Sequence, residues 1–161
     1  MKPNILKACF AGFMATAVIT LMVYFVSPGL TGGPSDLAAL IATLLGVSWI
    51  AGLSAHFVVG TFVLPGIYAL FLNGWLSGGP AVRGMTWGLL LWLLSQVVII
   101  PLTGGGFFSS HWGGLRAVMD SLVGQLIYGL VLGVLTGTPR PGPVTTRHEF
   151  EPEPHVPHHA G

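Results

Sequence analysis

The sequence predicts an all-α membrane protein: four transmembrane helices arranged as two tandem repeated helical hairpins, with a short interfacial helix and a disordered C-terminal tail. Of its 161 residues, 52% are hydrophobic and only 7% are charged, whereas soluble domains carry about 25% charged residues. The chain contains four apolar runs, each long enough to cross a hydrocarbon core of about 30 Å as a helix. A pattern of small and polar residues in the first half also returns in the second half.

The four apolar runs define a transmembrane domain over residues 1–137. Backbone groups cannot go unpaired in lipid, so a spanning segment is either a helix or a barrel strand. Barrel strands are shorter and alternate between apolar and polar residues, and these runs do not alternate. We therefore expect spanning helices over residues of about 5–26, 47–72, 82–102 and 117–136.

A shorter apolar segment, PSDLAALIATLLG, precedes the second spanning helix. Ser35 or Asp36 is suited to cap a helix, and Pro34 suits the start of one. A helix over about 35–45 is too short to cross a bilayer, so we expect it to be interfacial or re-entrant. The alternative is that the segment extends the helix over 47–72.

The lysines and arginines predict the orientation, because cytoplasmic loops carry an excess of them. Only Arg116 lies in a loop on the far side. We expect both termini in the cytoplasm, on the side of the other five: Lys2, Lys7, Arg83, Arg140 and Arg147.

Residues 138–161 differ in character from the rest of the chain. They include six prolines and four histidines. Such a segment cannot bury a core, so we expect a disordered Pro/His-rich cytoplasmic tail. The spacing of its histidines is not typical of a closed metal site, and we expect no metal.

The two halves of the chain share residues at intervals of four. The first spanning helix carries Gly12, Thr16, Thr20 and Tyr24. A shift of 72 positions gives Gly84, Gly88, Trp92 and Gln96. In the second helix the set is Gly52, His56 and Gly60, and a shift of 69 gives Ser121, Gln125 and Gly129. Such positions share one helix face, where small residues allow close packing in lipid. The chain therefore reads as a duplicated two-helix unit whose pseudo-two-fold axis follows the membrane normal.

His56 is an ionisable residue in the middle of an apolar run. Such residues are costly in a membrane and mark candidate functional sites. The repeat places Gln125 at the matching depth, so we expect the two to be polar partners across the pseudo-axis. Together with Tyr24 and Gln96 they form the candidate intramembrane polar site.

Four interpretations of His56 stay open. In the first, a neutral imidazole hydrogen-bonds inside the bundle. In the second, His56 faces another protein. A third interpretation is a haem ligand, although the repeat supplies Gln125 where a second histidine would be needed. The fourth is a titrating group on a proton or substrate path, although no carboxylate partner lies within the membrane.

The remaining polar residues indicate no reaction. His111, Arg116 and Asp120 are expected to form a cluster on the outer face. We find no pattern typical of a Ser-His-Asp set, of paired intramembrane carboxylates or of a zinc protease, so we expect no enzyme and no cofactor. A net charge of +1 without a basic patch gives no reason to expect a nucleic-acid partner.

Four stretches carry a resemblance that covers residues 8–137: AGFMATAVITLM, AHFVVG, RGMTWGLLLWLLSQVVIIPLTGGGFF and GQLIYGLVLG. Together they resemble a family of small uncharacterised bacterial four-helix integral membrane proteins of unknown function. The resemblance implies a multi-pass protein of the bacterial inner (plasma) membrane and implies no reaction. In that family the position of Gln125 is often histidine. This chain departs from that paired-histidine pattern, which weakens the case for a haem bound inside one copy.

The sequence therefore predicts a non-enzymatic accessory or scaffolding subunit of a larger membrane complex, of which a respiratory complex is one example. Low intramembrane charge and small-residue packing faces motivate this expectation. One alternative is a small homo-oligomeric transporter or channel, with His56 and Gln125 lining the path. A second alternative is a haem-binding electron-transfer subunit. The expected partners are the lipid bilayer and either other membrane subunits or further copies of the chain.

Overall fold

The computed structural model describes residues 4–31, 36–72 and 75–137, and all regular structure in these ranges is helical. Four helical stretches are long and apolar enough to cross a membrane. We call them the first to fourth spans: Ile5–Gly29, Trp49–Leu72, Pro80–Leu102 and Leu115–Thr136. They confirm the predicted all-α, multi-pass membrane fold class. The tail predicted over 138–161 lies outside the described residues.

The spans consist of the following helices. The first span contains α1 (Ile5–Phe25), which is followed by α2 (Ser27–Thr31). The short helix α3 is Leu37–Leu45. The second span consists of α4 (Trp49–Val58), η1 (Val59–Val63), α5 (Leu64–Ile67) and η2 (Tyr68–Leu72). The third consists of α6 (Pro80–Leu94), η3 (Ser95–Ile99) and α7 (Ile100–Leu102). After the turn η4 (Phe107–Ser109), α8 (Leu115–Thr136) forms the fourth.

The observed bounds differ from the expected ranges by a few residues, and local chemistry explains two of the differences. The second span begins at Trp49, not at 47, because the Ser48 side chain accepts a hydrogen bond from the Ala51 N–H and caps the helix there. The third span begins at Pro80, not at 82. Proline suits the first turn of a helix, where its missing N–H costs nothing.

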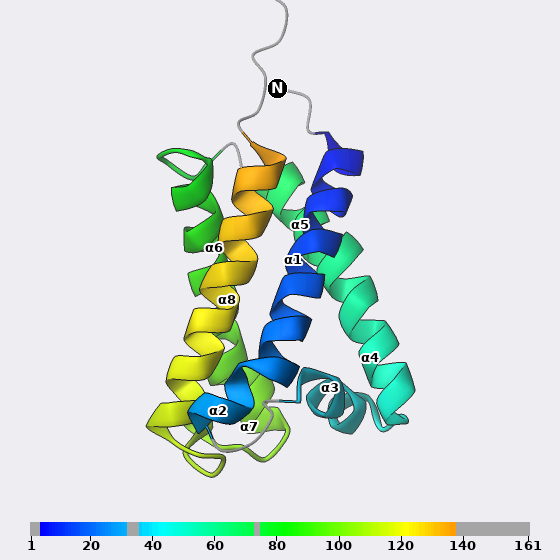
Figure 1. The fold of residues 1–161 in the computed structure, drawn as a ribbon, viewed down its shortest axis with the longest axis vertical. Helices are drawn as coiled ribbons and strands as arrows, with labels where there is room; N and C mark the ends of the chain where they lie inside the picture. The colour runs from blue at the N-terminus through cyan, green and yellow to red at the C-terminus, as the bar shows by residue number, and fades with distance from the viewer. Residues whose placement is uncertain (1–3, 32–35, 73–74, 138–161) are drawn as a thin grey trace, which may run out of the picture.

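The four spans form one bundle (Figure 1). The start of α1 and the end of α8 lie at the same end, which we call the terminal end, and α2, α3 and α7 lie at the opposite loop end. The first span packs against the second and the fourth, and the fourth packs against the third. At the terminal end the rings of Tyr68 and Trp87, from the second and third spans, lie 6.5 Å apart.

Glycines allow close approach within each pair of consecutive spans. A Cβ atom added at Gly84 in the third span would lie 2.9 Å from the Gly129 carbonyl carbon of the fourth. One added at Gly12 in the first span would lie 2.8 Å from the Gly60 carbonyl oxygen of the second. No real Cβ tolerates such distances to backbone, so both interfaces need glycine there. The two interfaces use positions related by the shifts of 72 and 69, although the origin of the chain by duplication stays a prediction.

Two prolines interrupt the spans and widen the helix before them. Leu64 N–H bonds to the Val59 carbonyl, five residues back, just before Pro65. Ile100 N–H likewise bonds to the Ser95 carbonyl, just before Pro101. A proline has no N–H and clashes with the carbonyl four residues earlier, which explains the local π-helical turns.

The turn before Pro65 leaves one carbonyl to be satisfied from another span. In the five-residue register, the carbonyl of Gly60 would pair with the N–H of residue 65, which proline lacks. The Tyr128 hydroxyl of the fourth span donates to this carbonyl at 2.8 Å. The two halves of the chain are therefore joined by a buried hydrogen bond at the proline defect.

The short helix α3 is separate from the second span. It ends at Gly46, whose φ of +66° is left-handed and favours glycine. It then packs back against α4, where Gly52 lies directly against Ala38 and Ala42. Figure 1 shows α3 between the loop ends of α1 and α4. The predicted short helix is thus present, and the alternative in which it extends the second span is wrong.

Candidate functional site

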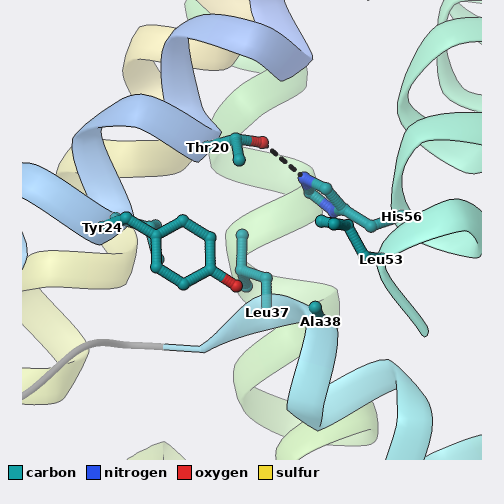
Figure 2. Close-up of a pocket in the computed structure, with 7 residues that line it drawn as sticks. Thr20, Tyr24, Leu37, Ala38, Leu53 and His56 are labelled. Carbon is teal, nitrogen blue, oxygen red and sulfur yellow. Dashed lines mark hydrogen bonds between the residues drawn. The ribbon is translucent and has the colours of Figure 1, made fainter. Parts of the chain in front are cut away.

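His56 points from α4 toward the first span. Its Nε2 lies 3.2 Å from the Thr20 Oγ1 (Figure 2). The Thr20 hydroxyl also lies 2.7 Å from the carbonyl oxygen of Thr16, to which it donates its only proton. Since that proton is used, Nε2 is the donor of the hydrogen that bridges to Thr20. His56 therefore makes an interhelical hydrogen bond to the first span.

A small pocket surrounds this hydrogen bond. The space between its side chains is too small to hold a water molecule, whereas typical small-molecule sites enclose roughly 300–1,000 Å³. Its walls come from α1, α3 and α4, and consist of Thr20, Val23, Tyr24, Leu37, Ala38, Leu53 and His56. In this structure the pocket leaves no room for a haem, and Nε2, one of the two atoms able to ligate the iron, is already bonded to Thr20. Among the described residues, no three His, Cys, Asp or Glu side chains come together as a metal site.

Gln125 is not the partner of His56. His56 lies one turn before Gly60, on the face of the second span that packs against Thr16 and Thr20. Gln125 lies one turn before Gly129, on the face of the fourth span that packs against the third. The two faces are equivalent within their own pairs of spans. The face that carries His56 meets the first span, and the face that carries Gln125 meets the third span, so the two faces do not meet each other across the pseudo-two-fold axis.

Tyr24 belongs to a clamp around Asp36 at the start of α3. The Tyr24 hydroxyl donates to Asp36 Oδ1 and the Trp49 indole donates to Oδ2, each at 2.9 Å. The Ala39 N–H also donates to Oδ1 at 2.9 Å, so Asp36 caps α3 while it joins α1 to α4. Partial burial raises the pKa of Asp36, but the hydrogen bonds from Ala39, Trp49 and Tyr24 outweigh it. The net effect lowers the pKa of this carboxyl below its ordinary value.

Gln96 has an equivalent role in the third span. It is fully buried, donates to Ser121 Oγ at 2.8 Å and accepts from Ser109 Oγ at 3.0 Å. Ser109 and the preceding Phe108 are non-glycine residues with left-handed backbones, at φ of +53° and +51°. The bond to Gln96 holds this strained turn against the bundle. Tyr24 and Gln96, which the shift of 72 relates, thus each hold the segment that follows their own span.

The predicted outer-face cluster of His111, Arg116 and Asp120 does not form. Asp120 is buried, at 7% exposure, and accepts from Ser27 Oγ at 2.8 Å. His111 is exposed and its Nδ1 lies 3.1 Å from the Gly104 carbonyl oxygen. Arg116 is exposed on the first turn of α8. Asp120 is one turn further along α8, and there it faces α2 and not the surface.

The four residues of the predicted intramembrane site therefore lie apart: His56 in its bond to Thr20, Tyr24 in the Asp36 clamp, Gln96 in its serine network and Gln125 on the face of α8 next to Gly88. The bonds of Asp36 to Tyr24 and Trp49, of Ser109 to Gln96 and of Ser27 to Asp120 were not predicted. For Asp36 the sequence did carry a signal, its capping position before an apolar helix. For Ser27 and Ser109 the sequence carried no such signal, because a single serine next to an apolar run does not indicate a bonding partner.

Comparison with known proteins gives a family and no activity. No curated protein and no solved structure shows a significant match to this chain. A family model described as a family of unknown function matches residues 3–146, which includes all four spans. The chain therefore belongs to that family, DUF6789.

Proposed function

We propose that this chain is a non-enzymatic accessory or scaffolding subunit of a larger complex in the bacterial inner membrane. The observation that supports the proposal is that several of its intramembrane polar groups bond to one another or to the backbone. His56 bonds to Thr20, Tyr128 bonds to the Gly60 carbonyl, and Gln96 bonds to two serines. Polar groups used in this way hold the bundle together.

The outward-facing side chains of the spans are large and apolar. Phe25 of the first span and Ile50 and Phe62 of the second are 79%, 72% and 58% exposed. In lipid, helices associate through packing and close contact, not through a hydrophobic force. A rigid apolar bundle suits a subunit that fills or organises a place among other spanning helices.

Purification of the tagged chain from its own host in a mild detergent tests this proposal. We expect other membrane subunits to co-purify in stoichiometric amounts, identified by mass spectrometry. His56→Ala should retain them, because His56 bonds inward to Thr20. An unrelated four-span protein with the same tag controls for nonspecific capture. A chain that migrates alone at native abundance contradicts the proposal.

A transporter or channel is the second candidate, because His56 is an ionisable residue within a span and lines the small pocket next to Thr20. Proton flux into liposomes, followed with a pH-sensitive dye, tests it. If the imidazole carries the proton, His56→Ala abolishes flux while Thr20→Val, which removes the hydrogen bond but keeps the imidazole, retains part of it. No flux in the unmodified chain excludes proton transport.

A further inference from the structure

Two buried hydrogen-bond donors at the terminal end have no partner among the described residues. The Tyr68 hydroxyl and the Trp87 indole N–H are both inaccessible and unbonded, and their residues are 0% and 8% exposed. Their rings come from the second and third spans and lie 6.5 Å apart. A buried donor without an acceptor costs about 1–3 kcal/mol. Two such unbonded donors on neighbouring rings indicate that an acceptor is missing from this place.

A positive charge lies beside the same pair. Arg83 is one helical turn before Trp87 in α6, so both lie on one face of that helix. The guanidinium is also close enough to Tyr68 for an electrostatic interaction. The two neutral donors and this cation all favour an acceptor that carries negative charge.

The depth of the pair matches the boundary of the membrane. The second span has 24 residues, about 36 Å of helix against about 30 Å of hydrocarbon. Tyr68 begins the last five residues of that span, and Arg83 lies in the first turn of the third. Leu72 and Leu76 pack against the core cluster that contains Tyr68 and Trp87. The pair thus lies near the terminal ends of the second and third spans, close to the phosphate layer.

We propose that Tyr68 and Trp87, with the charge of Arg83, bind a phosphate group at the terminal end of the bundle. The phosphate comes either from an anionic lipid headgroup or from free phosphate. Because both donor atoms are covered, binding requires the side chains around them to move. The phosphate oxygens then accept the two hydrogen bonds that the protein leaves unmade.

Thermal unfolding of the purified full chain in a neutral detergent tests the site. The additions are phosphatidylglycerol, inorganic phosphate and diacylglycerol, which lacks phosphate. We expect phosphatidylglycerol to raise the midpoint and diacylglycerol not to. In Tyr68→Phe and Trp87→Phe the apparent affinity should fall at least about tenfold, since each loses a hydrogen bond to a charged group. A shift with inorganic phosphate alone, lost in the same variants, identifies free phosphate as the ligand.

Tyr128→Phe is the matched control, because the Tyr128 hydroxyl is equally buried but bonds to the Gly60 carbonyl. Without additives it should lower the unfolding midpoint, whereas Tyr68→Phe should not. With phosphatidylglycerol it should keep the full shift. Native mass spectrometry of Arg83→Gln, counting bound lipid, gives a second readout if an aromatic variant fails to fold. No shift with either phosphate compound, or an equal shift with diacylglycerol or in Tyr68→Phe, overturns the proposal.

Discussion

The clamp around Asp36 gives the most direct prediction of stability. Asp36→Ala removes the cap of α3 and the two side-chain bonds to α1 and α4 together. Trp49→Phe and Tyr24→Phe each remove one of these bonds and leave the cap intact. The three variants therefore separate the capping contribution from the tethering contribution.

The structure sets the size of the effect. Loss of a cap costs about 1 kcal/mol. Hydrogen bonds to a charged group contribute about 1.5–3 kcal/mol. Because the Asp36 clamp is partly exposed to water, the hydrogen bonds from Tyr24 and Trp49 should each contribute near the lower value or below it. We expect Asp36→Ala to destabilise α3 by about 3 kcal/mol, which raises its opening constant about 100-fold. Each single aromatic variant should cost about 1 kcal/mol, or about fivefold.

Hydrogen exchange of the α3 amides, followed by mass spectrometry, measures this opening directly. Exchange of α3 should accelerate strongly in Asp36→Ala and weakly in Trp49→Phe, while exchange in α8 stays unchanged. Unaltered protection of α3 in Asp36→Ala would refute the reasoning, because it would mean that packing against Gly52 alone holds the helix.

Three further predictions concern the same fold. Because the pKa of Asp36 is lowered in the folded state, its contribution to the free energy of unfolding should be complete above the ordinary carboxyl pKa of about 3.9. This contribution should be lost as the pH falls through the lower folded-state pKa. Unfolding measured over a pH series should show the loss in the parent chain and not in Asp36→Asn. Gly129→Leu should destabilise the protein by at least about 3 kcal/mol in detergent unfolding, because the new side chain meets the backbone of α6. Gly66→Leu places the same side chain in open space and should stay within about 1 kcal/mol of the parent. Equal effects of the two variants would contradict the packing argument. Ser109→Gly should be about 1 kcal/mol more stable than Ser109→Ala, since both lose the bond to Gln96 but only glycine relieves the left-handed strain; the reverse order would show that the turn is unstrained.

The spans could be predicted from the sequence because apolar length alone decides what crosses a bilayer. The packing faces followed from small residues at intervals of four, and Gly12, Gly60, Gly84 and Gly129 do lie at the interfaces. The partner of His56 could not be predicted in the same way. A repeat gives equivalent positions within each pair of spans, and two equivalent positions need not face each other. Which neighbour each face meets depends on the order of the spans in the bundle.

The polar contacts at the loop end were also beyond the sequence pattern. Asp36 was expected to cap a helix, but its bonds to Tyr24 and Trp49 depend on how α3 folds back between α1 and α4. Asp120 was placed at the surface because it is charged and near a loop. Its burial against Ser27 depends on α2, a single turn that continues the first span beyond its expected end.

The hydrogen bond from Tyr128 to the Gly60 carbonyl bears on how the protein is made. Membrane helices enter the bilayer in the order of synthesis, so the second span arrives while the fourth does not yet exist. Until then the carbonyl that Pro65 leaves open has no Tyr128 to satisfy it, and it sits in lipid or draws in water. The first hairpin is therefore an unfinished intermediate that the last span completes. We expect the nascent chain to depend most on an insertase or a chaperone at this stage, because the unpaired carbonyl of Gly60 then lies in the bilayer without Tyr128.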